Sequence, residues 1–406
     1  MSNVLELSVP FISEKTDSYL QQVLSHREAA HTPDHHNFTV QMTSIPWDTL
    51  WHELVNVGLY KHGADVSQIG TSWIGGLMAM DALRPFSATE IAKLGGEAAF
   101  LPAAWQANLL KEQPNSVWAI PLVADPRVIF YRRDLLEKAG INEAEAFKDI
   151  HALDETLERL QANGLETPWA VPTCKTRNTL HYIASWIWGA GGDFTSEDGQ
   201  QLLFAQSQSL SGICAYYNLH RFMPHRLNFL GEEEVLHLLA DGEIAVTICG
   251  PWGFRYLQGT GQLNKIARIR LALPPGPSFV GGLCNVIWKH VSYQKAPAAV
   301  DLVSYLIQPE IESNYAKISS YLPTRLDLLN QPPYTTQPEH QVFAEALKSG
   351  RPHPPFMRWG LIEDRLVNTL DEIWTHLYHN PDQDVSALVT PRLETLARRF
   401  GTALTG

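Results

Sequence analysis

The first 83 residues alternate between strand-like and helix-like segments, and this alternation constrains the fold more than any other feature of the chain. Strand-like segments are short apolar or alternating runs, whereas helix-like segments carry apolar side chains three and four positions apart. Strands are expected at residues 4–10, 38–45 and 63–71, and helices at residues 14–30, 46–59 and 72–83. This order predicts an α/β domain built on a parallel sheet.

Length and charge narrow the class of protein. The chain has 406 residues, 45% of them hydrophobic and 18% charged, and such a length predicts roughly two to three globular domains. With 31 basic and 43 acidic residues the formal net charge is -12, which argues against a nucleic-acid partner and against a polybasic membrane contact. The sequence has no apolar run of about 18 residues, so no transmembrane helix is expected.

The N-terminal stretch MSNVLELSVPF has neither a basic segment nor a long apolar segment, so the sequence shows no secretory signal peptide. Two locations stay open. The protein is cytoplasmic if Met1 is its native start, and extracytoplasmic if a leader has been removed. Four cysteines, Cys174, Cys214, Cys249 and Cys284, form no CxxC pair and leave the disulfide state open.

Motifs that carry chemistry are sparse. The sequence contains no GxSxG, HExxH or P-loop motif, and no GxGxxG follows the first strand. The 16 histidines are scattered, and the pair His35 and His36 has no further ligand at metal-binding spacing. We therefore predict no catalytic residue, no cofactor and no metal site. A pair of carboxylates from distant segments, as glycoside hydrolysis requires, stays open.

Two segments are expected to connect two lobes. In residues 116–140 the apolar runs AIPLV and VIFYR flank the stretch from Ala124 to Arg127, and the helix after them ends at Gly140. The proline-rich segment 271–291 is the second expected crossing, because proline stiffens such a connection. The predicted lobes are residues 1–123 with 277–324, and residues 124–276 with 325–406.

The stretch EIAVTICGPWGFRYL, residues 243–257, places a large aromatic side chain where water can reach it. A buried strand is expected first, and a Gly-Pro turn then presents Trp252. Trp73, Trp188 and Trp359 also lie beside breaks rich in glycine or proline. Each tryptophan alone is more simply a core residue. Together they predict a cleft with apolar faces and a few polar groups, which suits the C–H faces and hydroxyls of a sugar.

Asp125 and Arg127 flank Pro126 at the first expected crossing. One interpretation is an exposed turn with a weak local ion pair. The other is a carboxylate and a guanidinium placed to form charge-assisted hydrogen bonds with ligand hydroxyls. The residues alone leave both interpretations open.

Four stretches carry a resemblance to a known family. They are GADVSQIGTSWIGGLMAMDALRPF, AIPLVADPRVIFYRRDLLEKAG, LADGEIAVTICGPWGF and SSYLPTR. In this order, across nearly the whole chain, they resemble family 1 extracellular solute-binding proteins, the carbohydrate-binding components of ABC importers, with maltose-binding protein as a distant relative. The resemblance implies a two-lobed, periplasmic-binding-protein-like α/β fold of type II. Each lobe would be a sheet flanked by helices, with the ligand in the cleft between the lobes.

The resemblance also implies a set of ligand contacts. Trp252 would stack on a sugar ring, and Asp125 would accept hydrogen bonds from sugar hydroxyls, with Arg127 nearby. Trp359 is carried over on the loosest match. The other expected contacts are Thr71, Ser72, Trp73, Thr179, His181, Gly282, Asn285, Tyr321 and Arg325.

The implied function is to bind a neutral mono- or oligosaccharide by hinge closure. The protein would deliver the sugar, as a monomer, to the permease subunits of an ABC importer. Because the family is normally exported and no signal peptide is visible, two other functions stay open. One is a cytoplasmic carbohydrate-sensing module that acts through a protein partner. The other is a glycoside-processing enzyme that uses Asp125 with a second carboxylate.

Overall fold

The computed structural model describes most of the chain, and the described residues fall into two compact units. The described ranges are 4–29, 38–197, 199–224, 230–261, 263–353 and 356–404, so His35 and His36 lie outside them. Unit 1 comprises Met1–Asp125, Val280–Thr335 and Pro355–Gly360, and unit 2 comprises Pro126–Phe279, Thr336–Pro354 and Leu361–Gly406. Relative to the predicted lobes, residues 124–125, 325–335 and 355–360 lie in unit 1 rather than in the second lobe, and residues 277–279 lie in unit 2 rather than in the first.

Local contacts explain this difference in the boundaries. The backbone N–H of Arg325 donates to the buried carboxylate of Glu312, which ties the start of segment 325–335 to unit 1. The carbonyl oxygen of Phe356 lies 2.3 Å from the position that a Cβ would take on Gly75. Such close backbone packing is available only to glycine. Neither contact leaves a signal in the hydrophobic pattern.

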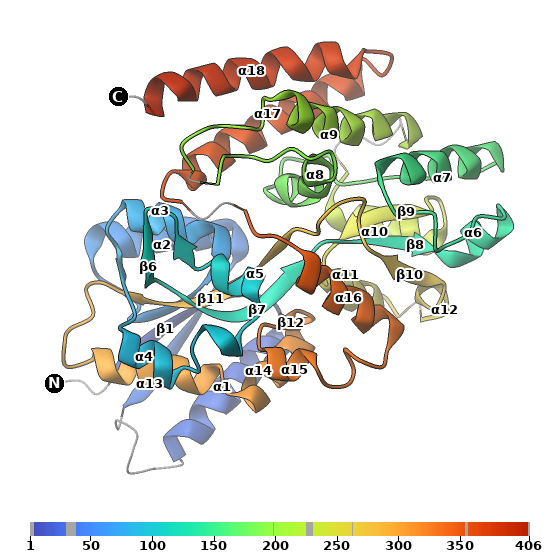
Figure 1. Cartoon of the computed structure of the whole chain (residues 1–406). Helices are drawn as coiled ribbons and strands as arrows, with labels where there is room; N and C mark the ends of the chain where they lie inside the picture. Colours follow the sequence, from blue (N-terminus) through green and yellow to red (C-terminus); the bar gives the residue numbers. More distant parts are fainter. Residues whose placement is uncertain are drawn as a thin grey trace. The chain divides into compact units, whose positions relative to one another are not determined.

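Unit 1 is built on a seven-stranded sheet in the order β12-β7-β11-β3-β1-β2, with β4 paired to β11 (Figure 1). β1 pairs in parallel with both β2 and β3, as the strand–helix alternation predicts, whereas β11 runs antiparallel to β3. A separate hairpin joins β5 and β6. The strands are β1 (Val4–Pro10), β2 (Thr39–Ile45), β3 (Val66–Gly70), β4 (Leu83–Arg84), β5 (Leu109–Leu110), β6 (Gln113–Val117), β7 (Ile120–Pro126), β11 (Val280–Trp288) and β12 (Leu322–Pro323).

Helices cover both faces of the unit 1 sheet (Figure 1). They are α1 (Glu14–Ala29), α2 (Trp47–Tyr60), α3 (Ile74–Ala79), α4 (Ala88–Lys93), α5 (Pro102–Gln106), α13 (Ala296–Leu306), α14 (Pro309–Ser319) and α15 (Leu326–Leu329), with 3-10 turns at Thr71–Trp73 and Glu97–Ala99. Leu5, Leu7 and Val9 alternate along β1 and are at most 1% exposed. Apolar side chains at these alternating positions are why the segment forms a strand of the core, although burial is continuous from Leu7 to Pro10.

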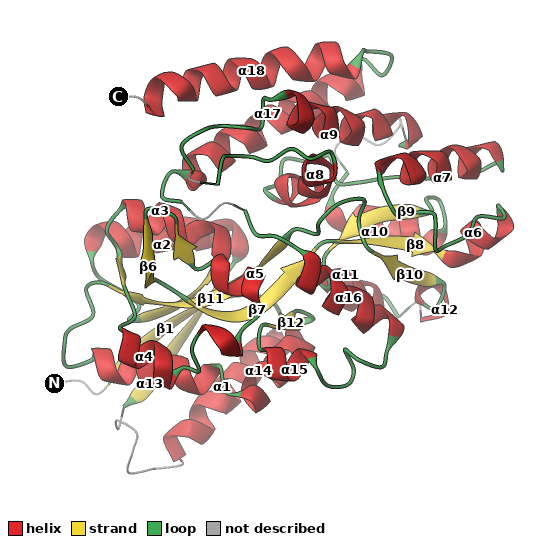
Figure 2. Ribbon diagram, viewed as in Figure 1, coloured by secondary structure: helices red, strands yellow, loops and turns green. Residues whose placement is uncertain are grey.

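Unit 2 contains a three-stranded antiparallel sheet in the order β10-β8-β9 (Figure 2). Its strands are β8 (Val128–Arg132), β9 (Val246–Cys249) and β10 (Ile269–Ala272). The helices are α6 (Arg133–Lys138), α7 (Ile150–Ala162), α8 (Asn178–Gly189), α9 (Ser207–Asn218), α10 (Glu232–Asp241), α11 (Trp252–Gly259), α12 (Leu263–Ile266), α16 (Pro338–Ser349), α17 (Trp359–His379, starting in unit 1) and α18 (Val385–Leu404), with a 3-10 turn at Leu219–Phe222.

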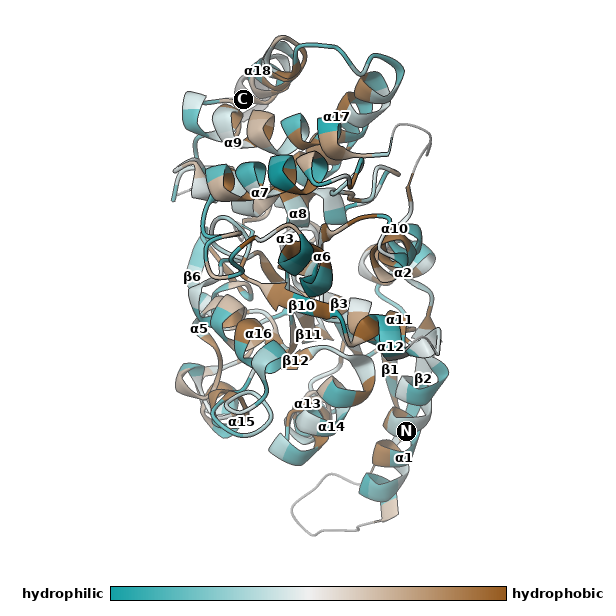
Figure 3. Cartoon of the chain, turned by 90° about the vertical axis from the view of Figure 1, so that its right-hand side faces the viewer, coloured by the Kyte–Doolittle hydropathy of each residue, from teal (hydrophilic) through white to brown (hydrophobic). Residues whose placement is uncertain are grey.

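An aromatic core holds the helices of unit 2 together. Trp186 of α8 lies 6.0 Å from Trp169 and 5.1 Å from Tyr216 of α9, measured between ring centroids. Tyr217 and Trp374 of α17 are 4.7 Å apart. Helices such as α17 carry both hydrophilic and hydrophobic residues, as Figure 3 shows, and the hydrophobic residues supply this core. None of the described helices combines the length and the apolar character that crossing a membrane requires.

A glycine of β11 marks the tightest strand contact of unit 1. Gly282 has φ +144°, and a Cβ at this position would lie 2.0 Å from the carbonyl oxygen of Val123 in β7. We predict that Gly282→Ala lowers the free energy of unfolding by about 2 to 4 kcal/mol, because it adds both backbone strain and overpacking. Urea unfolding measures this change.

Gly360→Ala is the matched control in unit 1. Its added methyl group would approach only the Cα of Gly76, at 4.0 Å, so we expect less than about 0.5 kcal/mol of destabilisation. Equal effects of the two substitutions would contradict the steric account of Gly282.

Candidate functional site

The parallel strands of unit 1 end at one edge of the sheet. β1 pairs residue by residue with β2, from Val4 with Thr39 to Pro10 with Ile45, and β3 lies on the other side of β1. Their carboxyl ends therefore share an edge, where open α/β sheets commonly bind ligands. The residues at this edge, called rim 1 here, are Phe11, Trp47, Thr71, Ser72, Trp73, Asp125, Gly282 and Tyr321.

Aromatic side chains dominate rim 1. Trp73, in the turn after β3, is buried and contacts two tryptophans of α2: Trp47 at 5.8 Å in a T-shaped arrangement and Trp51 at 5.7 Å, between ring centroids. Trp47 itself is 41% exposed, and Phe11, directly after β1, is 42% exposed. The cluster thus offers aromatic surface to solvent from a rigid base, since edge-to-face pairs stabilise such clusters by about 0.5 to 1.5 kcal/mol each.

The other members of rim 1 come from the antiparallel part of the sheet. The start of β11 lies beside the end of β3, because Leu283 pairs with Gly70. Ala124 of β7 pairs with Leu322 of β12, so the adjacent Asp125 and Tyr321 lie at the same edge. Thr71, Ser72, Asp125 and Tyr321 are all partly exposed. Rim 1 therefore combines aromatic surface with hydroxyl and carboxylate groups.

Two of the predicted ligand contacts, Gly282 and Asn285, lie on β11 and have roles in the packing of the sheet. Gly282 is required by the close backbone of β7, as its φ and its contact with Val123 show. Asn285 lies opposite Gln68 of β3 and is fully buried in the core of unit 1. Neither amide atom of Asn285 has a hydrogen-bond partner among the described residues. The structure thus places Asn285 inside the sheet, away from rim 1.

Arg325 follows β12 and pairs with a neighbour in its own segment. Its Nε and Nη2 contact the two carboxylate oxygens of Asp327 at 3.0 and 3.1 Å. Its backbone N–H and that of Thr324 donate to Oε1 of Glu312, at 3.1 and 2.6 Å. Burial raises the pKa of Glu312 to about 8, despite these donors. The buried carboxyl group therefore fixes the backbone of the SSYLPTR segment.

Trp359 is the first residue of α17 and is 2% exposed. Its ring lies 5.9 Å from that of Phe356 in a T-shaped arrangement. The structure therefore places Trp359 in a packed interior environment.

Unit 2 has a corresponding edge of its own. Cys249 at the end of β9 pairs with Val128 at the start of β8, so the residues that precede β8 and follow β9 lie together. Arg127 precedes β8, and Trp252 begins α11, two residues after the glycine that follows β9. The backbone N–H of Arg127 donates to the carbonyl of Phe279 at 3.0 Å. Arg127, Trp252, Phe279 and the contacting residues Asn178 and His181 of α8 are called rim 2 here.

Trp252 is only partly buried and stands at a tight helix–strand junction. Pro251 occupies the N-cap position of α11, which fixes the direction of the first turn. A Cβ on Gly253 would lie 2.8 Å from Sγ of Cys249, so the glycine allows α11 to approach β9 closely. The Gly-Pro-Trp-Gly sequence therefore fixes the backbone position of Trp252 on rim 2, and the role of its indole in ligand binding stays a prediction.

Arg127 is a charged residue that is only 2% exposed, and its side chain is held in place by several neighbours. Its Nη2 donates to Oδ1 of Asn178 at 3.0 Å. Its guanidinium carbon lies 5.7 Å from the ring centroid of Tyr182 and 6.0 Å from that of Phe279. Aromatic faces and an amide oxygen thus surround the buried charge, which is a favourable setting for a guanidinium.

His181 joins this network through the same amide. Its Nδ1 lies 2.8 Å from Oδ1 of Asn178, and its ring stacks on Phe279 with centroids 4.1 Å apart. Burial, followed by the positive charge of Arg127, holds the pKa of His181 well below its ordinary value of 6.5. Thr179, on the same helix, is buried. Thr179 and His181 were both predicted to contact the ligand, and of the two the structure shows only His181 beside Arg127.

Several residues of the two rims were not predicted. Trp47 and Phe11 follow β2 and β1, just as Trp73 follows β3, so the rule that picks out strand ends would have identified both. Asn178 and Phe279 gave no signal of their own, because their contacts with Arg127 arise only when distant segments meet. In the described part of unit 2, His181, His353 and Glu363 form a group able to hold a metal ion.

Comparison with known proteins agrees with this architecture. Residues 29–342 match the family of bacterial extracellular solute-binding proteins. The match spans most of the chain, so the protein belongs to that family. A protein of Brucella abortus (strain 2308), named as a binding protein, is 22% identical over 379 residues, which cover 91% of this chain and 88% of the relative. A Deinococcus radiodurans protein, named as an ABC transporter-binding protein, is 25% identical over 304 residues, covering 70% of this chain and 69% of that protein.

Solved structures define the fold. The sugar-binding protein MalE of Xanthomonas citri superposes with a TM-score of 0.80 at 19% identity, covering 99% of this chain and 97% of that one. A Thermotoga lettingae solute-binding protein, bound with alpha-D-tagatose, gives a TM-score of 0.79 at 19% identity, with 99% and 100% coverage. The chain thus has the same α/β fold as these two proteins.

The buried carboxyl group of Glu312 predicts an unusual pH dependence. Its pKa of about 8 lies above the ordinary 4.5, so between these values the folded state holds a proton that the unfolded state has lost. Stability is therefore fully present below about pH 4.5 and falls as the pH rises toward 8. The variant Glu312→Gln lacks this titrating group. We predict that the unfolding free energy of the wild type, taken relative to that of Glu312→Gln, falls by about 2 kcal/mol from pH 6 to pH 8. Denaturant titrations at both pH values measure this difference, and a pH-independent difference would contradict it.

Proposed function

We propose that this protein binds a carbohydrate, a mono- or oligosaccharide, and delivers it to an ABC importer. Rim 1 and rim 2 each offer groups that suit a sugar. The observation that carries the proposal is the composition of rim 1. Trp47 and Phe11 expose aromatic surface at the carboxyl edge of a sheet that also carries Thr71, Ser72 and Asp125.

This combination suits a sugar ring better than other small ligands. The C–H faces of a sugar need flat apolar surface, which the indole of Trp47 offers. Its hydroxyls need several donors and acceptors at fixed places. Thr71, Ser72 and Asp125 offer hydroxyl and carboxylate oxygens on rim 1. We propose a neutral sugar, because the two rims carry both the carboxylate of Asp125 and the guanidinium of Arg127.

The names of similar proteins support the same ligand class. Alpha-D-tagatose is bound in the Thermotoga lettingae structure, and the Xanthomonas citri protein is named as a sugar-binding protein. The Deinococcus radiodurans relative is named as an ABC transporter-binding protein, which supports permease subunits as the partner. The proposal is binding and delivery rather than turnover, in keeping with a family of solute-binding proteins. An extracytoplasmic location follows from the same proposal.

Trp252 should contribute a stacking contact from rim 2. We predict that Trp252→Ala weakens binding of the tightest sugar in a panel of maltose, maltotetraose and tagatose by about 1 to 3 kcal/mol. Calorimetric titration gives the affinities. Tyr293→Ala, which removes a side chain that is 94% exposed, is the control and should leave affinity unchanged. Unchanged affinity of the Trp252 variant would remove this residue from the binding site.

Trp47 tests the part played by rim 1. We predict that Trp47→Ala weakens the same sugar by about 1 to 2 kcal/mol, because its exposed indole lies against Trp73 in a fixed orientation. Trp47→Phe should restore part of the loss, since it keeps an aromatic face. If Trp47→Ala binds as tightly as wild type while Trp252→Ala does not, sugar binding would depend on rim 2 without rim 1.

A further inference from the structure

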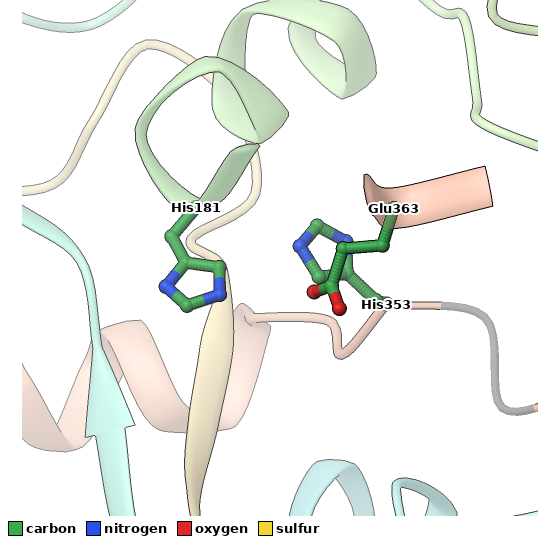
Figure 4. Close-up of side chains that lie close together, drawn as sticks. All are labelled: His181, His353 and Glu363. Atoms are coloured by element: carbon green, nitrogen blue, oxygen red, sulfur yellow. The ribbon is translucent and has the colours of Figure 1, made fainter. Parts of the chain in front are cut away.

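We propose that unit 2 binds a zinc ion through His181, His353 and Glu363. His181 comes from α8, Glu363 from α17, and His353 from the segment between α16 and α17 (Figure 4). One ligand atom from each side chain lies within 4.8 Å of the other two. The site shares His181 with rim 2, whereas His353 and Glu363 lie outside rim 2.

The distances fit a metal site that tightens on binding. Zinc bonds to nitrogen and oxygen are about 2.0 to 2.2 Å long, which places tetrahedral ligand atoms about 3.4 Å apart. The three ligand atoms would therefore move closer together when a metal ion binds. Two imidazoles and one carboxylate form a set that zinc adopts with three protein ligands, leaving a fourth position for water.

The hydrogen bonds of Asn178 fix which nitrogen of His181 is available. The amide Nδ2 of Asn178 donates to Oε1 of Glu232, which only accepts, so the amide Oδ1 must point toward His181. Oδ1 is an acceptor, so the 2.8 Å contact places a proton on Nδ1 of His181, and the 3.2 Å approach of Nη2 of Arg127 to the same nitrogen is then a close contact rather than a hydrogen bond. Nε2 then carries the lone pair. This atom is buried and has no hydrogen-bond partner among the described residues.

This arrangement is the one that metal-binding histidines usually have. A ligating imidazole donates its second N–H to an oxygen of the protein, which fixes both the tautomer and the ring orientation. Asn178 supplies that oxygen for His181, and stacking on Phe279 holds the ring plane. The side chain is therefore already oriented for coordination.

Glu363 is oriented in the same way. Its side chain is 0% exposed, and Nη1 of Arg177 donates to Oε2 at 2.7 Å. Ligating carboxylates are commonly held by such a hydrogen bond, and here it fixes the orientation of the Glu363 carboxylate. His353 is packed among aromatic rings, 4.5 Å from Phe279 and 5.1 Å from Phe194 between centroids.

The local charges define which ion fits. Arg127 and Arg177 are both near the site, and their positive charges repel a cation. Ions that are held mainly by electrostatic attraction to oxygen ligands are therefore disfavoured. Mg²⁺ and Ca²⁺ take oxygen ligands and would find only one carboxylate here. Zinc gains from the two imidazoles, whose bonds do not require a net negative site. Coordination would also occupy His181, leaving the other members of rim 2 to meet the sugar.

The test is zinc titration of the untagged, EDTA-treated full chain against a competing indicator, with thermal unfolding in parallel. We expect one zinc per chain and a rise in melting temperature, with no rise in Mg²⁺ or Ca²⁺. Glu363→Gln keeps the size and an oxygen for Arg177, and it should weaken zinc affinity at least about tenfold. His353→Gln should have the same effect.

A surface pair supplies the control. His151 and Glu155 lie 3.3 Å apart on α7 and are exposed, so His151→Gln should leave zinc binding unchanged. Melting without zinc establishes that each variant folds, and His181→Asn replaces any that does not. Wild-type protein without bound zinc would overturn the proposal. Zinc that binds Glu363→Gln, His353→Gln and wild type equally would also overturn it.

Discussion

Parallel pairing of β1 with both β2 and β3 is the constraint on which the candidate site of unit 1 depends. Because the three strands point the same way, each one delivers the residue after it to the same edge. Trp47 and Trp73 meet there although 26 positions separate them in the sequence, and their rings then hold each other in place. Burial of Leu5, Leu7 and Val9 fixes the register, so the hydrophobic core also determines where the aromatic surface stands.

Unit 2 reaches a similar result with different means. Its antiparallel sheet brings Arg127 and Trp252 together through the pairing of β8 with β9. The polar groups are then ordered by a chain of hydrogen bonds, in which Glu232 orients Asn178, and Asn178 orients both Arg127 and His181. Aromatic rings fill the space around these groups. The low polarity of that shell makes each hydrogen bond more directional and each unpaired group more costly.

Local patterns in the sequence were sufficient for the strand–helix order of unit 1 and for the Gly-Pro-Trp turn, because periodicity and turn chemistry act over a few residues. The same reasoning placed Trp73, Arg127 and Trp252 beside breaks or crossings in the chain, whereas Thr71 and Ser72 were implied as ligand contacts only by the family resemblance. Sequence reasoning could not tell a ligand contact from a residue with a structural role. Asn285 has its polar side chain buried in the sheet, and Gly282 is required by the backbone of Val123. His353 and Glu363 lie far from His181 in the sequence, and only the tertiary fold of unit 2 brings the three together.

The central claim is that this chain binds a carbohydrate. Thermal unfolding against a panel of mono- and oligosaccharides, with amino acids and polyamines as controls, tests it most directly. A ligand that binds only the folded state raises the melting temperature by mass action, by an amount that grows with its concentration. The account predicts such a rise for at least one sugar and for none of the controls. A rise with an amino acid or a polyamine, and none with any sugar, would contradict it.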